Sequence, residues 1–292
     1  MLFARAYHIC PVLMDESRCM SLLAQVTSFL GRTVLRARLW LYFGLTRPGT
    51  CDDEIHIRFF RWGIPLVLKQ TSRTISTEAD ALRFLNREVP HLPIPKLIDT
   101  FQLDGSTYTV MTKLPGQRLD DLPDMDPDDF SRLISDILYI LDELCNIPQP
   151  STLSGKVMAS ASGHGLPHPV GGYEGIGGPY NSIYELYQSM VLDLTMHSPE
   201  TLRPILEDRV VWIPTDLAKQ NILIQNGKLS GIVDWQDAGW LPRHWLLHRL
   251  RTPRLGCSGQ WVRYWLFEHK FERQIEAAYE ASRVKDMLEW RI

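Results

Sequence analysis

The chain has 292 residues, 45% hydrophobic and 22% charged, which suits one large globular domain or two closely packed lobes. Its formal net charge of -3 gives no reason to expect nucleic acid as a partner. The five cysteines are scattered without a CxxC pair, which argues against a zinc site or a disulfide framework and favours a reducing compartment, so we expect a cytoplasmic protein. No apolar run reaches the roughly 18 residues of a transmembrane segment.

The first 50 residues are expected to form a helical extension, because leucine and valine recur at helical spacing over residues 18–45. Between Glu16 and Asp52 there is no acidic residue. The same stretch contains five arginines: Arg18, Arg32, Arg36, Arg38 and Arg47. Such a segment is either a helix with a solvated basic face, which we favour, or an organelle-targeting or membrane-surface segment.

Residues 51–114 have the pattern of a small antiparallel sheet with one helix. Alternating residues predict strands at 55–59 and 64–69, and a short helix over 76–85 begins with Ser76 or Thr77 as its cap. Strands at 97–101 and 108–111 are expected to pair as a hairpin around Asp104-Gly105.

Residues 115–292 are mainly helical in pattern. Asp126-Pro127 is a typical helix start, and further helices are expected from Tyr184 to Leu194 and from Phe267 to Trp290. Residues 150–182 are rich in Gly, Pro and Ser, which is typical of a functional loop or a mobile lid. His164 and His168 lie in this stretch without companions at metal-ligand spacing, so we expect a solvated loop rather than a metal site.

Three polar residues are spaced around a predicted hairpin. Asp216 follows an apolar strand, Asn221 comes five residues later, and Asp234 ends the strand that follows a turn at residues 225–228. A hairpin of this length brings Asn221 and Asp234 to the same end, where an amide oxygen and a carboxylate suit Mg²⁺. Asp216 would then orient or deprotonate an attacking hydroxyl, as phosphoryl transfer requires.

The sequence from Pro214 to Trp240, PTDLAKQNILIQNGKLSGIVDWQDAGW, resembles the catalytic segment of the aminoglycoside phosphotransferase family, especially its fungal relatives. The pattern of that family is roughly HGDL-x3-NIL-turn-GIIDWE-x-AGW. The resemblance covers about residues 55–245. It implies an α+β, bilobal protein-kinase-like fold, with a nucleotide-binding N-lobe over residues 51–114 and a catalytic, acceptor-binding C-lobe over residues 115–292. It also implies ATP and Mg²⁺ as cofactors, with Asn221 and Asp234 as metal ligands and Asp216 as the catalytic residue.

By the same resemblance Lys69 would hold the α and β phosphates, and Glu78 would fix Lys69. The backbone of the hinge would take adenine, at Thr112, Lys113 and Leu114. Two positions depart from the family pattern: its His-Gly before the catalytic Asp is here Pro214-Thr215, and no glycine-rich loop precedes Lys69, where only Gly63 stands in a turn.

These features predict an ATP- and Mg²⁺-dependent phosphotransferase with an alcohol group of a small molecule as acceptor. The alternative is a pseudokinase, catalytically weak or inactive, that acts as a binding module. A protein substrate is not expected, because Asp234 is followed by Trp235 and neither Asp-Phe-Gly nor Ala-Pro-Glu is present. The sequence does not predict an oligomeric state.

The acceptor class is left open by a basic stretch. Between Asp237 and Glu268 there is no acid, while five arginines are present: Arg243, Arg249, Arg251, Arg254 and Arg263. If the stretch borders the acceptor site, an anionic or neutral acceptor is favoured over a polyamine; otherwise it is a basic surface helix. We expect Trp235 and Trp240 to be core residues and Asp237 to be a surface carboxylate rather than a metal ligand. For Lys219 two expectations stay open: contact with the γ-phosphate or the substrate, or exposure to solvent.

Overall fold

The computed structural model describes residues 16–49, 56–167, 175–190, 194, 197–251 and 259–283, with side chains in the first helix from residue 30 onward. The helices are α1 (Glu16–Leu45), α2 (Glu78–Glu88), α3 (Pro127–Cys145), α4 (Ile183–Met190), α5 (Pro199–Leu206), α6 (Trp245–Arg251), α7 (Gly259–Arg263) and α8 (Arg273–Ser282). The 3₁₀ segments are η2 (Leu119–Asp121), η3 (Ser151–Leu153) and η5 (Lys219–Asn221), and a π-helical turn, η6 (Tyr264–Glu268), follows α7. The strands are β1 (Thr46–Pro48), β2 (Ile57–Phe60), β3 (Leu66–Thr71), β4 (Leu97–Leu103), β5 (Ser106–Thr112), β6 (Gln117–Arg118), β7 (Leu166–Pro167), β8 (Ile176–Gly177), β9 (Val210–Ile213), β10 (Ile222–Gln225), β11 (Lys228–Ile232) and β12 (Gly239–Pro242).

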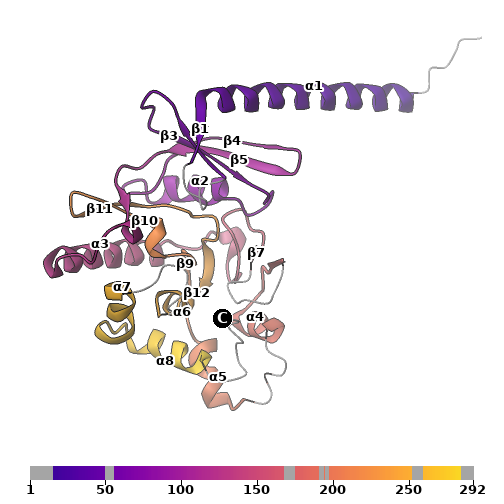
Figure 1. Ribbon diagram of the computed structural model, residues 1–292. Coiled ribbons are helices and arrows are strands. Elements are labelled where there is room, and N and C mark those ends of the chain that lie inside the picture. Colours follow the sequence, from indigo (N-terminus) through magenta and orange to yellow (C-terminus); the bar gives the residue numbers. More distant parts are fainter. Residues whose placement is uncertain are drawn as a thin grey trace, which may run out of the picture.

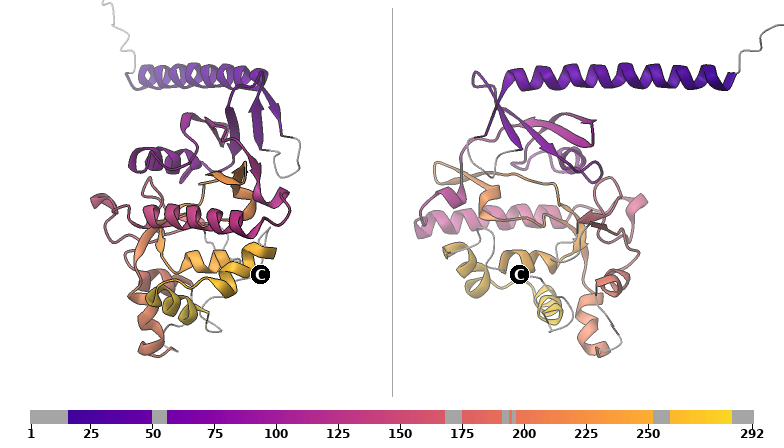
Figure 2. Two further views of the ribbon diagram at one scale, coloured as in Figure 1. Left: turned by 90° about the vertical axis from the view of Figure 1, so that its left-hand side faces the viewer. Right: turned by 45° about the vertical axis from the view of Figure 1, so that its right-hand side comes forward.

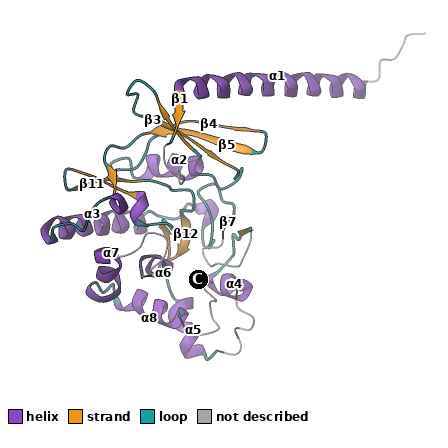
Figure 3. Ribbon diagram, viewed as in Figure 1, coloured by secondary structure: helices purple, strands orange, loops and turns teal. Residues whose placement is uncertain are grey.

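The molecule has two lobes, a sheet-based N-lobe above a mainly helical C-lobe (Figures 1 and 3). The N-lobe sheet is antiparallel with the order β1-β2-β3-β5-β4. The hairpin predicted around Asp104-Gly105 joins β4 and β5, and both turn residues have positive φ. The predicted α+β, bilobal kinase-like fold is confirmed. β1 was not predicted, and it lies within residues 1–50, whose assignment as a separate extension stays a prediction.

Helices cover both faces of the N-lobe sheet. α1 runs across the top and its N-terminal half extends beyond the rest of the molecule (Figures 1 and 2). Leu35, Leu39 and Tyr42 of α1 pack on the buried cluster that contains Phe60 and Phe101. Because α1 presents an apolar face to the sheet, the predicted helix over residues 18–45 becomes part of the N-lobe core from residue 35 onward.

The arginines of α1 pair with carboxylates on the β4–β5 hairpin. Arg32 and Arg36 both contact Asp104, and their side chains remain 58% and 62% exposed. Arg38 contacts Asp99 and is less exposed. The favoured expectation of a solvated basic face is therefore correct for Arg32 and Arg36, although their charge is partly neutralised.

α2 lies on the opposite face of the sheet and joins the two lobes. Its cap is Thr77, whose hydroxyl accepts from the Asp80 N–H while Asp80 accepts from the Thr77 N–H, so the cap is Thr77 rather than Ser76. Phe84 on its buried face contacts Trp212 and Trp240 of the C-lobe, with ring centroids 4.5 and 6.0 Å apart. This aromatic packing holds α2, including its first turn, against the C-lobe.

The C-lobe is built around α3 and a group of buried tryptophans. α3 begins as predicted, with Asp126 as cap and Pro127 as the first helical residue. Trp235 and Trp240 are 0% and 1% exposed, so the prediction that both are core residues is confirmed. None of the helices that the structure describes combines the length and hydrophobicity that a membrane span needs.

Part of the segment 150–182 is packed on the C-lobe. Val157, Met158 and Ala159 are buried, and the Met158 N–H donates to the Trp240 carbonyl of β12 at 2.7 Å, while residues 175–176 and 181–182 are exposed. The expectation of a functional loop or a mobile lid stays a prediction. His164 lies in an exposed turn, its ring nitrogen Nδ1 3.2 Å from the Ser162 hydroxyl, and residues 168–174 lie outside the described residues. The predicted terminal helix is described as α8, and residues 284–292 are not described.

Candidate active site

The β10–β11 hairpin brings two predicted site residues to one end. Ile222 pairs with Ile232, and the Val233 N–H donates to the Asn221 carbonyl at 2.9 Å. The turn residues Asn226 and Gly227 both have positive φ, as a tight two-residue hairpin turn requires. Asn221 and Asp234 therefore leave the same end of the hairpin, as their spacing predicted.

Lys69 connects the N-lobe sheet to α2 and to this hairpin. Its Nζ lies 3.0 Å from Glu78 Oε2 and 2.7 Å from Asp234 Oδ1. The other oxygen of Glu78 accepts from the Trp235 N–H at 3.2 Å, so Glu78 also holds the backbone next to Asp234. The Glu78 side chain is 2% exposed whereas that of Asp234 is 40% exposed, so Lys69 contacts one buried carboxylate and one carboxylate that solvent can reach.

The carboxylates of Glu78 and Asp234 stabilise the charged form of Lys69. Burial by itself would lower the pKa of the Lys69 ammonium, but the carboxylates of Glu78 and Asp234 outweigh it and hold that pKa above its ordinary value. Burial raises the pKa of the Glu78 carboxyl, against the opposing effect of Lys69. Asp234 itself has a φ of 61°, a left-handed conformation uncommon for a residue other than glycine and frequent at functional sites.

Asp216 lies beside Asn221 and an arginine. The Asn221 amide Nδ2 donates to the Asp216 carbonyl at 2.8 Å and to its Oδ2 at 3.1 Å. Asp216 Oδ1 forms an ion pair with Arg249 of α6. Because Asn221 donates through its nitrogen, its amide oxygen is oriented away from Asp216 and remains an acceptor. The sequence placed Arg249 in a basic stretch but gave no signal that it contacts Asp216.

Pro214-Thr215, which replaces the His-Gly of the family pattern, is joined to the segment after Asp234. The Thr215 hydroxyl donates to the Asp237 carbonyl at 3.0 Å. Arg73, which follows β3, pairs with the Asp237 carboxylate at 2.6 Å and donates to the Gln236 carbonyl at 2.9 Å. Asp237 is thus a partly exposed carboxylate, as expected, with a specific partner. Sequence reasoning missed Arg73, which only the fold brings to Asp237.

The hinge between the lobes uses most of its own backbone donors. The Thr112 N–H donates to the Lys96 carbonyl and the Lys113 N–H to the Pro65 carbonyl, at 2.9 and 2.8 Å. Thr112 and Lys113 therefore already use their N–H groups within the protein, and Leu114 is the remaining candidate for a backbone N–H that donates to adenine. The adenine-binding roles of all three residues remain predictions. Gly231 of the hairpin lies under the hinge, where a Cβ would be 2.7 Å from the Pro93 carbonyl oxygen and 2.3 Å from Leu114 Cδ1, so a larger residue would require the backbone to shift.

The turn that contains Gly63 is not placed to contact phosphates held by Lys69. It joins β2 to β3 at the hinge end, beside Lys113 and Leu114. At the other end of β2, the Gly49 N–H donates to the Ile57 carbonyl, and Ile57 pairs with Lys69. Residues 50–55 lie outside the described residues.

The basic stretch after Asp237 faces the C-lobe core. Arg243 is 8% and Arg251 5% exposed, and they pair with Glu272 and Glu276. His244, completely buried, bonds Asp208 at 2.6 Å. The alternative of a basic surface helix is wrong, since α6 is almost entirely buried. Arg254 lies outside the described residues, and Arg263 pairs with Glu268 at the surface.

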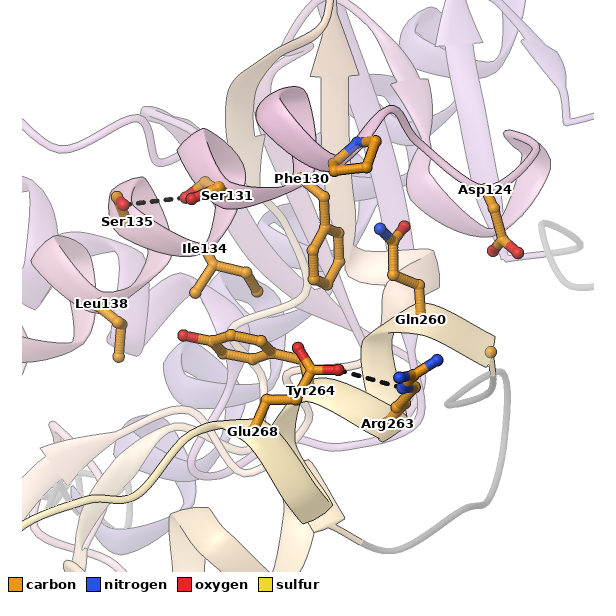
Figure 4. Close-up of a pocket in the computed structure, with 12 residues that line it drawn as sticks. Asp124, Phe130, Ser131, Ile134, Ser135, Leu138, Gln260, Arg263, Tyr264 and Glu268 are labelled. Carbon is orange, nitrogen blue, oxygen red and sulfur yellow. Dashed lines mark hydrogen bonds and ion pairs between the residues drawn. The ribbon is translucent and has the colours of Figure 1, made fainter.

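A cavity of about 780 Å³ lies elsewhere in the C-lobe, between the first half of α3 and the α7–η6 segment (Figure 4). Phe130 and Ile134 line it from α3, opposite Tyr264 and an Arg263–Glu268 ion pair. It shares no residue with the group around Asp216 and Lys69, so we assign it no part in the chemistry.

The oxygen donors fit a hard divalent cation. Asn221 offers an amide oxygen, and Lys69 contacts only Oδ1 of Asp234, so that Oδ2 has no partner among the described residues. In the part of the chain that the structure describes, no three His, Cys, Asp or Glu residues group as a metal site. An amide and a carboxylate nevertheless suit Mg²⁺, which is commonly held by one or two protein oxygens together with phosphates and waters.

Fold and site together define a two-lobed α+β architecture with a cluster of charged and amide side chains around Lys69, Asp216 and Asp234. The model of the phosphotransferase enzyme family matches residues 191–245, which contain Asp216, Asn221 and Asp234, so the resemblance stated from the sequence is confirmed over this segment. No curated protein matches the chain by sequence.

Solved aminoglycoside phosphotransferases share the fold at low sequence identity. The chain is similar to aminoglycoside phosphotransferase APH(4)-Ia, with 18% identity and a TM-score of 0.55 over 88% of each chain. It is also similar to APH(2")-IIa in its gentamicin complex, with 16% identity and a TM-score of 0.51 over 81% of this chain and 80% of that one. A thermostable APH(4)-Ia mutant, in a ternary complex with ADP and hygromycin B, gives 18% identity and a TM-score of 0.51 over 78% and 80%.

Proposed function

We propose that the protein transfers the γ-phosphoryl group of ATP to a hydroxyl of a small molecule, with Mg²⁺ as cofactor. The observation that carries the proposal is the bridge from Lys69 to Glu78 and Asp234, next to the Asp216–Asn221 pair. A cation, a metal-binding carboxylate and a second carboxylate that can receive a hydroxyl are the parts that phosphoryl transfer needs. The family match over residues 191–245 supports the same reaction class.

In this proposal each residue has one role. Lys69, held by Glu78, neutralises charge on the α and β phosphates, and Leu114 offers its backbone N–H to adenine. Asn221 and Asp234 hold Mg²⁺, which supplies positive charge to the β and γ phosphates when bound. Asp216 orients the acceptor hydroxyl and receives its proton as the oxygen–phosphorus bond forms. Asn221 fixes Asp216 by the hydrogen bond to its Oδ2.

The test is the variant Asp216→Asn. It keeps the size of the side chain and removes its capacity to accept a proton, so we expect ADP release to fall by about 10²–10⁴-fold. Nucleotide binding should be retained, because Asp216 contacts neither Lys69 nor Glu78 in the structure. At 100 times the dissociation constant, Mg-ATP should stabilise both proteins by about 2.7 kcal/mol in thermal unfolding.

The pseudokinase alternative predicts a different pair of results. A binding module would show the nucleotide-dependent stabilisation but equal, negligible ADP release by wild type and Asp216→Asn against every hydroxylated compound tried. A complete lack of stabilisation by Mg-ATP would contradict both functions. Full activity of Asp216→Asn would show that another group receives the proton.

A further inference from the structure

The basic stretch from Arg243 to Arg263 contributes one described cation to the candidate active site. The ion-pair partners of Arg243, Arg251 and Arg263 are Glu272, Glu276 and Glu268, which neutralise these arginines away from the site. Arg249, by contrast, ion-pairs with Asp216. Its side chain is 31% exposed and that of Asp216 is 28% exposed, so both can be reached from solvent.

The contact with Arg249 affects what Asp216 can do. Asp216 receives Arg249 at Oδ1 and the Asn221 amide at Oδ2, so each carboxylate oxygen already has a donor. An oxygen that already accepts a hydrogen bond from a guanidinium or an amide is less open to a further donor. In the ligand-free protein both oxygens of the residue that should receive the hydroxyl proton are therefore occupied by protein donors.

Arginine is suited to exchange one anion for another. Its planar guanidinium presents five N–H donors and binds carboxylate or phosphate groups through two parallel hydrogen bonds. A second anion near Arg249 would draw the guanidinium from Asp216. An ammonium group in the same place would be repelled by the guanidinium, because the two carry the same charge.

We propose that Arg249 selects the acceptor, by binding an anionic group, a carboxylate or a phosphate, on a hydroxylated small molecule. Binding moves the guanidinium from Asp216, which then accepts the hydroxyl proton. The acceptor oxygen forms its bond to the γ-phosphorus, and the bond from that phosphorus to the leaving oxygen of ADP breaks. This assignment rests on the phosphotransferase function proposed above and specifies its acceptor class.

The test measures ADP release by the full chain with Mg-ATP and four small probes. Glycerate and glycerol 3-phosphate carry a carboxylate and a phosphate, while glycerol is neutral and ethanolamine is cationic. For the wild type we expect either anionic probe to raise ADP release at least tenfold over glycerol, and ethanolamine to give no increase. Comparison of the two anionic probes identifies which anion Arg249 binds.

The variant Arg249→Gln separates Arg249 from other sources of selectivity. It removes the guanidinium donor from Asp216 Oδ1 and opens that oxygen to water, so ADP release with water as acceptor should rise at least threefold, and the anionic probes should lose their advantage over glycerol. In the double variant with Asp216→Asn the rise should disappear. Arg203→Gln, which alters an exposed arginine of α5, is the matched control and should behave as wild type.

Several results would overturn the assignment. Equal responses of the wild type to glycerol and the anionic probes would do so, as would Arg249→Gln releasing ADP no faster than wild type. An Arg249→Gln variant with a raised KM for ATP would show that Arg249 binds the nucleotide's own phosphate instead. If Arg249→Gln does not fold, the four probes on the wild type decide the question. Absence of Mg-ATP binding by the wild type would instead contradict the proposed function.

Discussion

Lys69 is the residue whose removal should disturb the site most. At 3.0 Å from Glu78 and 2.7 Å from Asp234, its two attractions are about 5.5 and 6 kcal/mol at an effective dielectric constant of 20. Desolvation of the buried groups offsets much of this. The variant Lys69→Met keeps the length of the side chain and removes its charge. We expect it to lower the free energy of unfolding by about 3–5 kcal/mol, the range for breaking a buried pair.

The companion variant Glu78→Gln tests the cause. In Lys69→Met the Glu78 carboxyl is left buried without its cation, and burial already raises its pKa. Replacing that carboxyl by an amide removes the buried charge and keeps an oxygen for the Trp235 N–H. The double variant should therefore be more stable than Lys69→Met alone, with a coupling of about 1–3 kcal/mol between the two positions.

Urea unfolding at pH 7 measures all three variants. Arg83→Met is the control, because Arg83 forms an exposed pair with Asp80 on the same helix, and it should change the stability by no more than about 0.5 kcal/mol. The reasoning would be refuted if Glu78→Gln destabilised Lys69→Met further, or if the two single effects simply added. Either result would mean that Glu78 is not held by Lys69.

Two further predictions concern packing and pH. Gly231→Ala should destabilise by about 1–3 kcal/mol, because its Cβ would lie 2.7 Å from the Pro93 carbonyl oxygen, which is backbone and cannot move aside easily. Gly44→Ala in α1 has open space and should be neutral or stabilising; equal urea midpoints for both would contradict this. Burial lowers the pKa of His248 well below 6.5, with His244 and two neighbouring arginines adding to the effect. Below pH 6.5 the histidine is protonated in the unfolded chain but stays neutral in the folded protein. The free energy of unfolding is therefore fully retained well above pH 6.5, and it falls by about 1 kcal/mol between pH 6.5 and 5.5. His248→Gln should flatten this dependence relative to wild type, and an unchanged slope would show that His248 is not its source.

Local sequence patterns were sufficient for much of the fold. The cap at Asp126-Pro127, the turn at Asp104-Gly105 and the hairpin around Asn226-Gly227 appear as predicted, because each depends on the conformational preferences of adjacent residues. The spacing from Asn221 to Asp234 predicted their common end of the hairpin for the same reason. The Gly, Pro and Ser content of the segment 150–182 indicated a functional loop or a mobile lid but not where the segment packs. Its backbone at Met158 and Ala159 bonds to β12, which is distant in sequence.

The sequence by itself determined the kinds of side chain available for chemistry and, within one hairpin, their order. Only the tertiary structure decided which charges meet. Lys69 and Asp234 are 165 residues apart, and Asp216 and Arg249 are 33 apart. Such contacts depend on how β3 of the N-lobe and α6 of the C-lobe are placed against the segments that carry Asp234 and Asp216, which no local preference encodes. The same packing buried Arg243 and Arg251, which pair with Glu272 and Glu276, and left Arg249 at Asp216, although all three look alike in the sequence.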